Sequence, residues 1–199
     1  MTMMLRVTAA VAVALSLGGC ALLGGGPKPP PWLMTLAPTT AAPASIVRSA
    51  NAGEAVTIEV PVIPKELRSV RVPAQQGGTA IAYIKGLQWV DTPDRLFQDL
   101  LAETVLRTTN RVVIDPKQAA LDPGLIVSGQ LSRFGYEAGE GSVLVRYDAA
   151  LAAAGGTRVE TRRFEARAPA DGTAATVGPA LNQAANQVAL EVASWIGGR

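Results

Sequence analysis

The chain has 199 residues, a formal net charge of +2, no histidine and a single cysteine. The absence of histidine excludes the Ser-His and Cys-His pairs of hydrolases, and it leaves too few soft ligands for a structural zinc site. The single cysteine excludes a disulfide within the chain, and a small net charge without a basic stripe argues against nucleic-acid binding.

Residues 1–19 have the pattern of a secretory signal peptide. Arg6 gives the start a positive charge, and residues 7–17 are almost entirely apolar. A charged start, an apolar stretch of about 7–15 residues and small residues before a cleavage site are typical of export signals. A membrane-spanning helix is the alternative, but residues 7–17 at ~1.5 Å rise per residue cover only about half of the ~30 Å hydrocarbon core.

The signal ends in Leu17-Gly18-Gly19-Cys20, which resembles the lipobox of bacterial lipoproteins. The resemblance implies cleavage between Gly19 and Cys20, a diacylglyceryl group on the Cys20 thiol and an acyl chain on its new amino group. An ordinary signal peptide with a chance cysteine is the alternative. Lipidation also accounts for the lone cysteine because it consumes the thiol. Beyond this covalent lipid, we expect no cofactor.

The residue after the lipidated cysteine is Ala21. In Gram-negative envelopes this position is read during lipoprotein sorting, and an aspartate there commonly retains the protein at the inner membrane. The small, neutral Ala21 therefore predicts an anchor in the inner leaflet of the outer membrane, with the domain facing the periplasm. The periplasmic face of the inner membrane is the alternative.

Residues 20–31 are predicted to form the lipidated cysteine and a tether. The glycines at 24–26 give a flexible joint, and the proline-rich residues 27–31 favour an extended polyproline conformation. A phosphate-binding role for the glycines is not supported because no Gly-Lys-Ser/Thr sequence follows. The tether is therefore expected to lift a single domain, residues 32–199, off the membrane.

The first part of this domain predicts short strands. Residues 32–38 read as a short first strand, followed by a loop. Residues 55–60 alternate apolar and polar side chains, as a half-buried strand does, and two prolines follow them. Further strands are expected at 70–72 and 79–84, on either side of a turn at 75–78.

The clearest helix comes next. Thr92 suits the N-cap, Pro93 the first helical position and Asp94 the first turn. Apolar residues then recur at helical spacing and predict a buried stripe of Leu96, Phe97, Leu100, Leu101, Thr104 and Val105. Asn110 is a helix stop, and residues 111–115 read as a strand.

The last part of the domain predicts a meander and a helix. Strands at about 125–137, 142–153 and 157–168 are joined by short glycine-containing loops, which favour antiparallel hairpins. A helix from about Pro179 to Ile196 has an apolar face. The whole predicts an α+β fold, in which a mainly antiparallel sheet is covered on one face by two helices.

Some side chains allow both a structural and a functional interpretation. We expect Trp89 to be a core residue rather than a partner anchor, and Trp195 with Ile196 to pack on the sheet rather than form an exposed patch. We expect the acidic residues around the start of the first helix to stabilise the helix dipole rather than to act in catalysis: Asp91, Asp94 and Asp99. The basic residues of the last strand read as edge protection, with lipid headgroups or an acidic partner as the alternative: Arg158, Arg162, Arg163 and Arg167.

Several degenerate motifs follow one another along the domain. They are Trp32-Leu33-Met34-Thr35-Leu36, residues 60–67, Val70-Arg71-Val72, Trp89 shortly before the helix, and Gly129-Gln130-Leu131-Ser132-Arg133-Phe134. In this order, over roughly residues 30–196, they resemble the ABC-type transport auxiliary lipoproteins, which include paraquat-inducible protein C-like members. Trp32 departs from the tyrosine expected in that family.

The resemblance implies a non-enzymatic, periplasm-facing lipoprotein. Its partners would be an MCE-domain protein and the associated ABC permease and ATPase, in systems thought to move lipids or other hydrophobic molecules between the two membranes. Association with further copies of the chain stays open. An alternative function is an envelope-assembly lipoprotein that aids insertion of lipopolysaccharide or outer-membrane proteins. An enzyme built on carboxylates, lysine or tyrosine is not supported, because no convergent cluster is evident.

Overall fold

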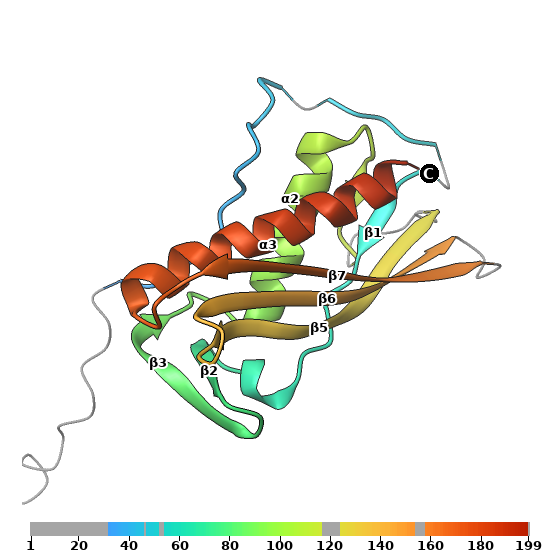
Figure 1. Ribbon diagram of the computed structural model, residues 1–199. Helices are drawn as coiled ribbons and strands as arrows, with labels where there is room; N and C mark the ends of the chain where they lie inside the picture. Colours follow the sequence, from blue (N-terminus) through green and yellow to red (C-terminus); the bar gives the residue numbers. More distant parts are fainter. Residues whose placement is uncertain (1–31, 46, 52–53, 117–123, 154–157, 199) are drawn as a thin grey trace, which may run out of the picture. The chain divides into compact units, whose positions relative to one another are not determined.

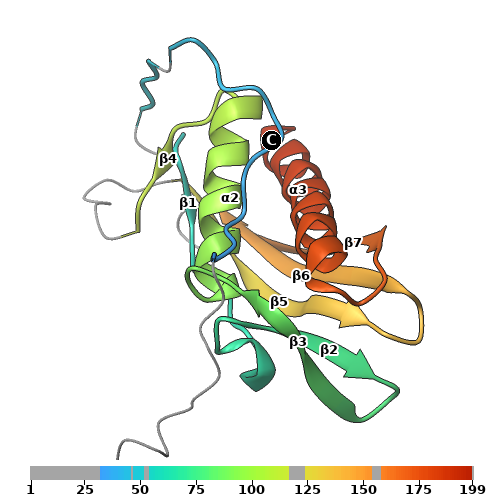
Figure 2. The ribbon, with the colours of Figure 1, turned by 90° about the vertical axis from the view of Figure 1, so that its left-hand side faces the viewer.

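The computed structural model describes residues 32–45, 47–51, 54–116, 124–153 and 158–198. Figure 1 shows the arrangement of the elements. In chain order they are β1 (Val56–Ile58), η1 (Lys65–Leu67), β2 (Arg71–Gln76), β3 (Ala80–Gln88), α2 (Pro93–Thr108), β4 (Val113–Ile114), β5 (Leu125–Glu137), β6 (Ser142–Ala153), β7 (Val159–Pro169) and α3 (Ala174–Gly197). All strands belong to one sheet, and α2 and α3 lie on the same face of it (Figure 2). The predicted α+β fold with two helices on one face is confirmed.

The sheet is built around β5. On one side β5 pairs antiparallel with β6, which pairs antiparallel with β7. On the other side it pairs in parallel with β1 near its start and with β2 near its end. In turn, β1 pairs in parallel with β4, and β2 pairs antiparallel with β3. The sheet is therefore mixed: it contains both antiparallel and parallel strand pairs. The parallel pairs join segments that lie far apart in the sequence.

A β-bulge keeps the buried side chains of β5 on one face. Leu131 is buried before the bulge, and Phe134 and Tyr136 are buried after it. Because side chains alternate with a period of two, these positions would point to opposite faces in a regular strand. The pairing with β6 shifts between positions 131 and 133, so Ser132 is the extra residue. The bulge thus restores the phase, and both halves of β5 face the helices.

The first long helix, α2, forms where the sequence predicted it. All the stripe residues are buried: Leu96, Phe97, Leu100, Leu101, Thr104 and Val105. Thr92 is at the N-cap, but its side chain does not cap the helix. Instead, the Asp91 carboxylate accepts a hydrogen bond of 2.7 Å from the Thr92 amide. The C-cap is Thr109, one position before the predicted stop at Asn110.

The second helix, α3, begins at Ala174 rather than near Pro179. The Asp171 carboxylate accepts hydrogen bonds from the Thr176 hydroxyl and from the Thr173 hydroxyl and amide, which lower its pKa to about 2. These bonds organise the first turn of α3. Pro179 lies so close to the start that it removes only the amide that would bond the Ala175 carbonyl.

Several predicted strand limits change in the structure. Within residues 32–38, Met34 makes an isolated bridge to Trp89 rather than a strand. β1 is shorter than predicted and is fully buried rather than half-buried, because it lies between β5 and β4. β2 continues through residues 75–76, which the sequence assigned to a turn, and β3 continues as far as Gln88.

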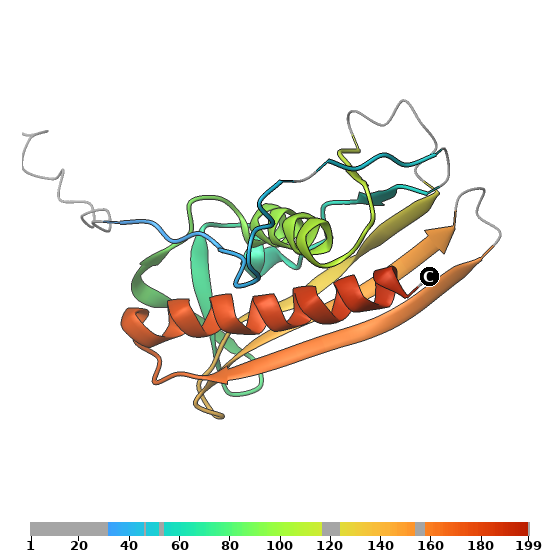
Figure 3. The ribbon, with the colours of Figure 1, turned by 90° about the horizontal axis from the view of Figure 1, so that it is seen from above.

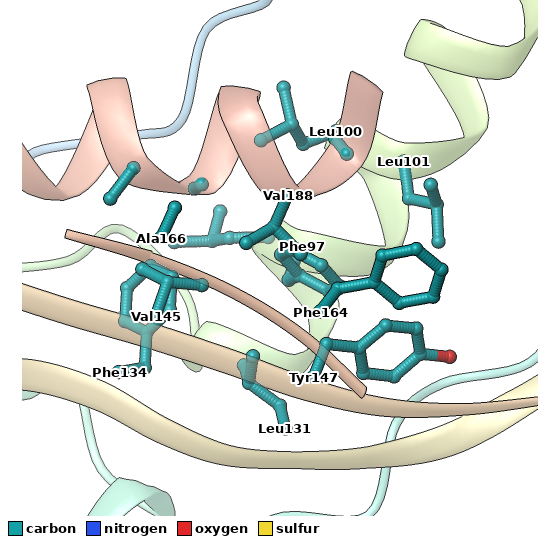
Figure 4. Packing of buried hydrophobic residues seen from close by; sticks show 14 of the residues in the cluster. Phe97, Leu100, Leu101, Leu131, Phe134, Val145, Tyr147, Phe164, Ala166 and Val188 are labelled. Carbon is teal, nitrogen blue, oxygen red and sulfur yellow. The ribbon is translucent and has the colours of Figure 1, made fainter. Parts of the chain in front are cut away.

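The core lies between the sheet and the helices. Phe97 of α2 packs on Tyr147 of β6 with ring centroids 5.1 Å apart (Figure 4). Small residues face one another where α3 crosses the sheet: α3 buries a run of alanines, and Ala149, Ala166 and Ala168 are buried on β6 and β7. Small side chains on both sides allow the helix to approach the strands closely.

Gly129 in β5 is required by the close packing of β6. A Cβ at this position would lie 2.3 Å from the Asp148 carbonyl oxygen and 2.8 Å from the Tyr147 ring. Both distances are well below an ordinary van der Waals contact, and the first partner is backbone. A side chain at Gly129 would therefore push the two central strands apart.

We expect Leu100→Ala to lower the free energy of unfolding by about 2–5 kcal/mol. The Leu100 side chain is 2% exposed and points into the core (Figure 4). Urea denaturation of residues 32–199, followed by circular dichroism, measures the change. The matched control is Arg95→Ala, at an exposed position of the same helix, which should change stability by less than about 0.5 kcal/mol. Equal effects of the two substitutions would contradict the predicted stripe.

Candidate functional site: the N-terminal strap

The residues predicted to carry the anchor lie outside the described residues. They are Gly19 and Cys20 at the predicted cleavage site and Ala21 at the sorting position. The described chain starts at Trp32, directly after the predicted tether. Residues 32–40, named the N-terminal strap, join that tether to the folded domain. They run beside both helices (Figures 2 and 3).

Met34 fixes the first part of the strap. Its amide donates to the Gln88 carbonyl and its carbonyl accepts from the Val90 amide, each at 2.8 Å. Its side chain lies against Gly178 of α3, where a Cβ would be 2.1 Å from the Met34 sulfur. Gly178 therefore has a structural role, because a larger residue would displace Met34 from the helix.

Two asparagines one turn apart on α3 hold the middle of the strap; they are named the asparagine clamp. Asn182 Oδ1 accepts from the Ala37 amide at 2.8 Å. Asn186 is 4% exposed, and its Oδ1 accepts from the Thr39 amide at 2.8 Å while its Nδ2 donates to the Ala37 carbonyl at 2.9 Å. A side-chain amide thus binds both a carbonyl and an amide of the strap, as a neighbouring β-strand would.

The end of the strap is held by α2. Arg107 Nη1 donates to the Thr40 carbonyl at 2.6 Å, and Arg107 Nε donates to the Glu103 carboxylate at 2.7 Å. The Arg107 side chain is largely shielded from solvent, so the bond to the carbonyl is worth more than an exposed one. The strap is therefore fixed to both helices and to the end of β3.

Apolar side chains are exposed where the strap begins. Trp32, Leu33 and Val90 are 52%, 53% and 55% exposed. Leu33 and Val90 flank the bridge between Met34 and Trp89. Apolar groups exposed at the start of the strap can contact a membrane surface or a partner protein.

A polar groove of about 760 Å³ lies beside the strap, at the C-terminal ends of α2 and α3. Arg48 Nη1 donates to the Arg111 carbonyl at 2.9 Å, and Arg111 Nη1 donates to the Glu54 carbonyl at 3.2 Å. The Asn51 amide and side chain donate to the Glu54 carboxylate and lower its pKa. The arginines thus satisfy carbonyls of the loops around the groove, which gives them a structural role.

An acidic cavity of about 410 Å³ lies on the other side of α2, lined by Asp99, Glu103 and Asp115 among others. Burial, and then the negative charge of Asp91, raise the pKa of Asp99. Within the part of the chain that the structure describes, no three His, Cys, Asp or Glu side chains are arranged to hold a metal ion. Of the aspartates predicted to stabilise the start of α2, Asp91 binds the Thr92 amide, Asp94 lies in the first turn and Asp99 lines this cavity.

The face of the sheet opposite the helices carries paired charges. Arg146 Nε donates to Glu165 at 2.6 Å, Arg163 Nε donates to Asp148 at 2.5 Å, and the Ser132 hydroxyl donates to Asp148 at 3.0 Å. Burial acts to raise the pKa of Asp148, but the bonds from Arg163 and Ser132 outweigh it and lower the pKa. The charges on this face therefore hold β5, β6 and β7 in register.

The basic residues predicted as edge protection occupy different environments. Arg158 pairs with Glu160 at 2.6 Å, and Arg167 pairs with Glu140 and Glu165. The Arg162 guanidinium lies 5.1 Å from the centre of the Phe164 ring. The arginines thus lie among carboxylates and a ring in or next to β7, an edge strand of the sheet, and their role in protecting that edge stays a prediction.

The tryptophans beside the helices are core residues, as predicted. Trp89 is 1% exposed and packs on Phe134 with ring centroids 5.6 Å apart. Trp195 packs on Phe164 at the same centroid distance of 5.6 Å, and Ile196 is fully buried. The sequence analysis missed the asparagine clamp. The available signal was the spacing of Asn182 and Asn186 by one helical turn on an otherwise apolar helix.

Comparison with known proteins gives a family and a fold. Residues 35–193 match the family described as the ABC-type transport auxiliary lipoprotein component. The crystal structure of protein XCC0632 from Xanthomonas campestris, assigned to family DUF330, is 17% identical with a TM-score of 0.65, over 76% of this chain and 90% of that one. The crystal structure of an uncharacterized protein is 16% identical with a TM-score of 0.59, over 75% and 96%. No curated protein sequence matches. In the described chain, no helix is long and apolar enough to span a membrane.

We expect Asn186→Ala to lower the free energy of unfolding by about 1–3 kcal/mol, because two hydrogen bonds to the strap, each worth about 0.5–1.5 kcal/mol, are lost. Urea denaturation measures the change, and hydrogen exchange at residues 37–40 should become faster. Gln183→Ala, at an exposed position of the same helix, is the matched control and should alter neither. Unchanged exchange at the strap in Asn186→Ala would show that the clamp does not hold it.

Proposed function

The chain belongs to the ABC-type transport auxiliary lipoprotein family, and from this premise we propose that it is the membrane-anchored, non-enzymatic auxiliary subunit of an MCE-type transport system. In this proposal the system moves lipids or other hydrophobic molecules across the periplasm. The observation that carries the proposal is the family match over residues 35–193, nearly the whole described domain. The partners would be the MCE-domain protein and its ABC permease and ATPase.

The proposed anchor is the lipid on Cys20. Two or three acyl chains hold a protein stably on a membrane, whereas one binds only marginally. The tether of residues 20–31 then leads into the N-terminal strap, whose bonds to α2 and α3 attach it to the folded domain. This arrangement supports a role in which the domain is kept at a membrane while it engages a partner.

The non-enzymatic role is supported by the chemistry of the residues. The sequence has no histidine, and the lone cysteine would be consumed by the lipid. The polar groove uses its arginines on backbone carbonyls, and the charged sheet face pairs its arginines with carboxylates. These groups are engaged in holding the fold, which leaves the domain suited to binding rather than to bond-breaking chemistry.

Membrane fractionation tests the anchor. We expect the wild-type protein to travel with outer-membrane markers on a density gradient, because Ala21 carries no retention charge. Ala21→Asp should move the protein to the inner-membrane fractions, and the matched control Ala21→Ser should not. Cys20→Ala should lose metabolically incorporated palmitate. Wild-type protein in the inner-membrane fractions would contradict the predicted location, and an unlabelled wild type would contradict lipidation.

Co-purification tests the partner. A tagged chain, crosslinked in intact cells and purified from solubilised membranes, should retain an MCE-domain protein together with its permease or ATPase. Cys20→Ala should retain less of them, because the unanchored chain is no longer concentrated at the membrane. Recovery of a barrel-type outer-membrane protein in place of the transporter would instead support a role in envelope assembly.

A further inference from the structure

The sheet ends in three edge strands that differ in how they are protected. β4 is two residues long, and Pro116 follows it closely. β7 carries five charged side chains and ends in Pro169. β3 is nine residues long, contains no proline and has one charged residue, Lys85. Natural proteins protect edge strands with short length, charge or proline because an open edge pairs with other chains. β3 has neither short length nor proline, and the register shift in its pairing with β2 and its single charge, Lys85, both lie after residue 83, so residues 80–83 form a regular open edge.

The side chains of β3 are also accessible. Ala80, Ile81 and Ala82 are exposed, and Tyr83 and Ile84 are half-buried. In the described chain, residues 80–83 pair with β2 and with no other strand, so their edge away from β2 is open. Figures 1 and 2 show β3 at the outer margin of the sheet. This edge offers a row of backbone donors and acceptors together with apolar side chains.

The same edge already binds an extended segment at its far end. The strand direction of β3 continues to Trp89 and Val90, and there Met34 of the strap pairs in parallel with two backbone bonds of 2.8 Å. The edge is therefore able to accept a further strand. The strap uses only this end of the edge and leaves the outer side of residues 80–83 without a strand partner among the described residues.

Charge identifies the kind of strand that fits. Around the hairpin of β2 and β3, residues 65–88 carry four basic side chains and one acidic one: Lys65, Arg68, Arg71, Lys85 and Glu66. The Arg71 guanidinium stacks over the Tyr83 ring of β3 at 3.8 Å from its centre. Arg71 and Lys85 thus place positive charge beside the open edge, where it attracts acidic groups.

We propose that the open edge of β3 at residues 80–83 is a docking site for an extended acidic segment of a partner protein, which adds to the sheet as a further strand. Strand addition takes its affinity from main-chain bonds and its specificity from alternate side chains. The chain's own tether is a poor occupant because Pro29, Pro30 and Pro31 have no amide hydrogen. A second copy is a poor occupant because Lys85 and Arg71 of the two copies would repel each other.

The inference rests on the proposed function only in assuming that the subunit has a protein partner. The two can fail separately. A chain found in the wrong membrane could still bind a strand at β3, and a correctly located chain could bind its partner elsewhere. The probe is therefore a peptide rather than the transporter.

The experiment uses the full-length chain in detergent micelles. The probe is a synthetic peptide of about nine residues, matched to the length of β3, in which valine alternates with threonine and glutamate. Fluorescence anisotropy measures its binding, and hydrogen exchange followed by mass spectrometry locates it. We expect binding of the peptide to slow exchange across residues 80–88. Two control peptides have lysine in place of glutamate, or proline at alternate positions, and both should bind more weakly.

Variants of the chain complete the test. Ile81→Glu and Lys85→Glu should each weaken peptide binding by about tenfold, because they place negative charge opposite the acidic strand. Val159→Glu introduces the same charge at an exposed position of the opposite edge strand β7 and should leave binding unchanged. Hydrogen exchange of β5 and α3 checks that each variant is folded.

Several outcomes would overturn the proposal. Slowed exchange elsewhere in the chain, or equal binding of the proline peptide, would show that the edge is not the site. If the lysine peptide bound as tightly as the glutamate peptide, the proposal that the partner segment is acidic would be wrong. Concentration-dependent self-association that protects residues 80–88 in the absence of peptide would make a second copy the occupant.

Discussion

The structure depends on keeping one face of the β5–β6–β7 ribbon apolar along its whole length. The bulge at Ser132 allows this, because it returns Phe134 and Tyr136 to the face already occupied by Leu131. The opposite face places arginine opposite carboxylate between β6 and β7. A slip by one residue would move these charges beneath α3 and the apolar side chains into solvent. The buried face and the ion pairs therefore specify the same register, and α2 and α3 are positioned by the surface that this register creates.

The attachment of the N-terminal strap follows from the position of α3. Once its alanine face lies on β6 and β7, the next face of the helix turns Asn182 and Asn186 toward the strap. Burying an amide such as Asn186 is costly unless its donors and acceptor find partners, and here the Ala37 carbonyl and the Thr39 amide supply them. The polar bonds of the strap thus depend on the apolar packing beneath. Loss of that packing would release the segment that joins the domain to its tether.

Local patterns in the sequence predicted the elements that local physics determines. The stripe of α2 and the antiparallel pairing of β5, β6 and β7 were predicted correctly, because periodicity and turn chemistry act over a few residues. The parallel pairs of β1 and β2 with β5 were not predicted, since pairing between distant segments leaves no local signal. β1 was taken as half-buried because of Thr57 and Glu59, yet Thr57 is buried between two neighbouring strands. The asparagine clamp was missed for the same reason, because its partners lie at the other end of the chain.

A membrane anchor increases the risk that an open edge strand leads to self-association. A chain held at a membrane, as proposed, moves in two dimensions beside its copies, and this raises the effective concentration for pairing between them. An open edge such as that of β3 is then a larger hazard than on a freely diffusing protein. The basic residues around it, Arg71 and Lys85 among them, disfavour pairing with an identical edge while leaving the backbone groups available. A surface that repels its own copies but keeps its donors and acceptors open selects for a partner of opposite charge, which is the property that a subunit of a larger membrane assembly requires.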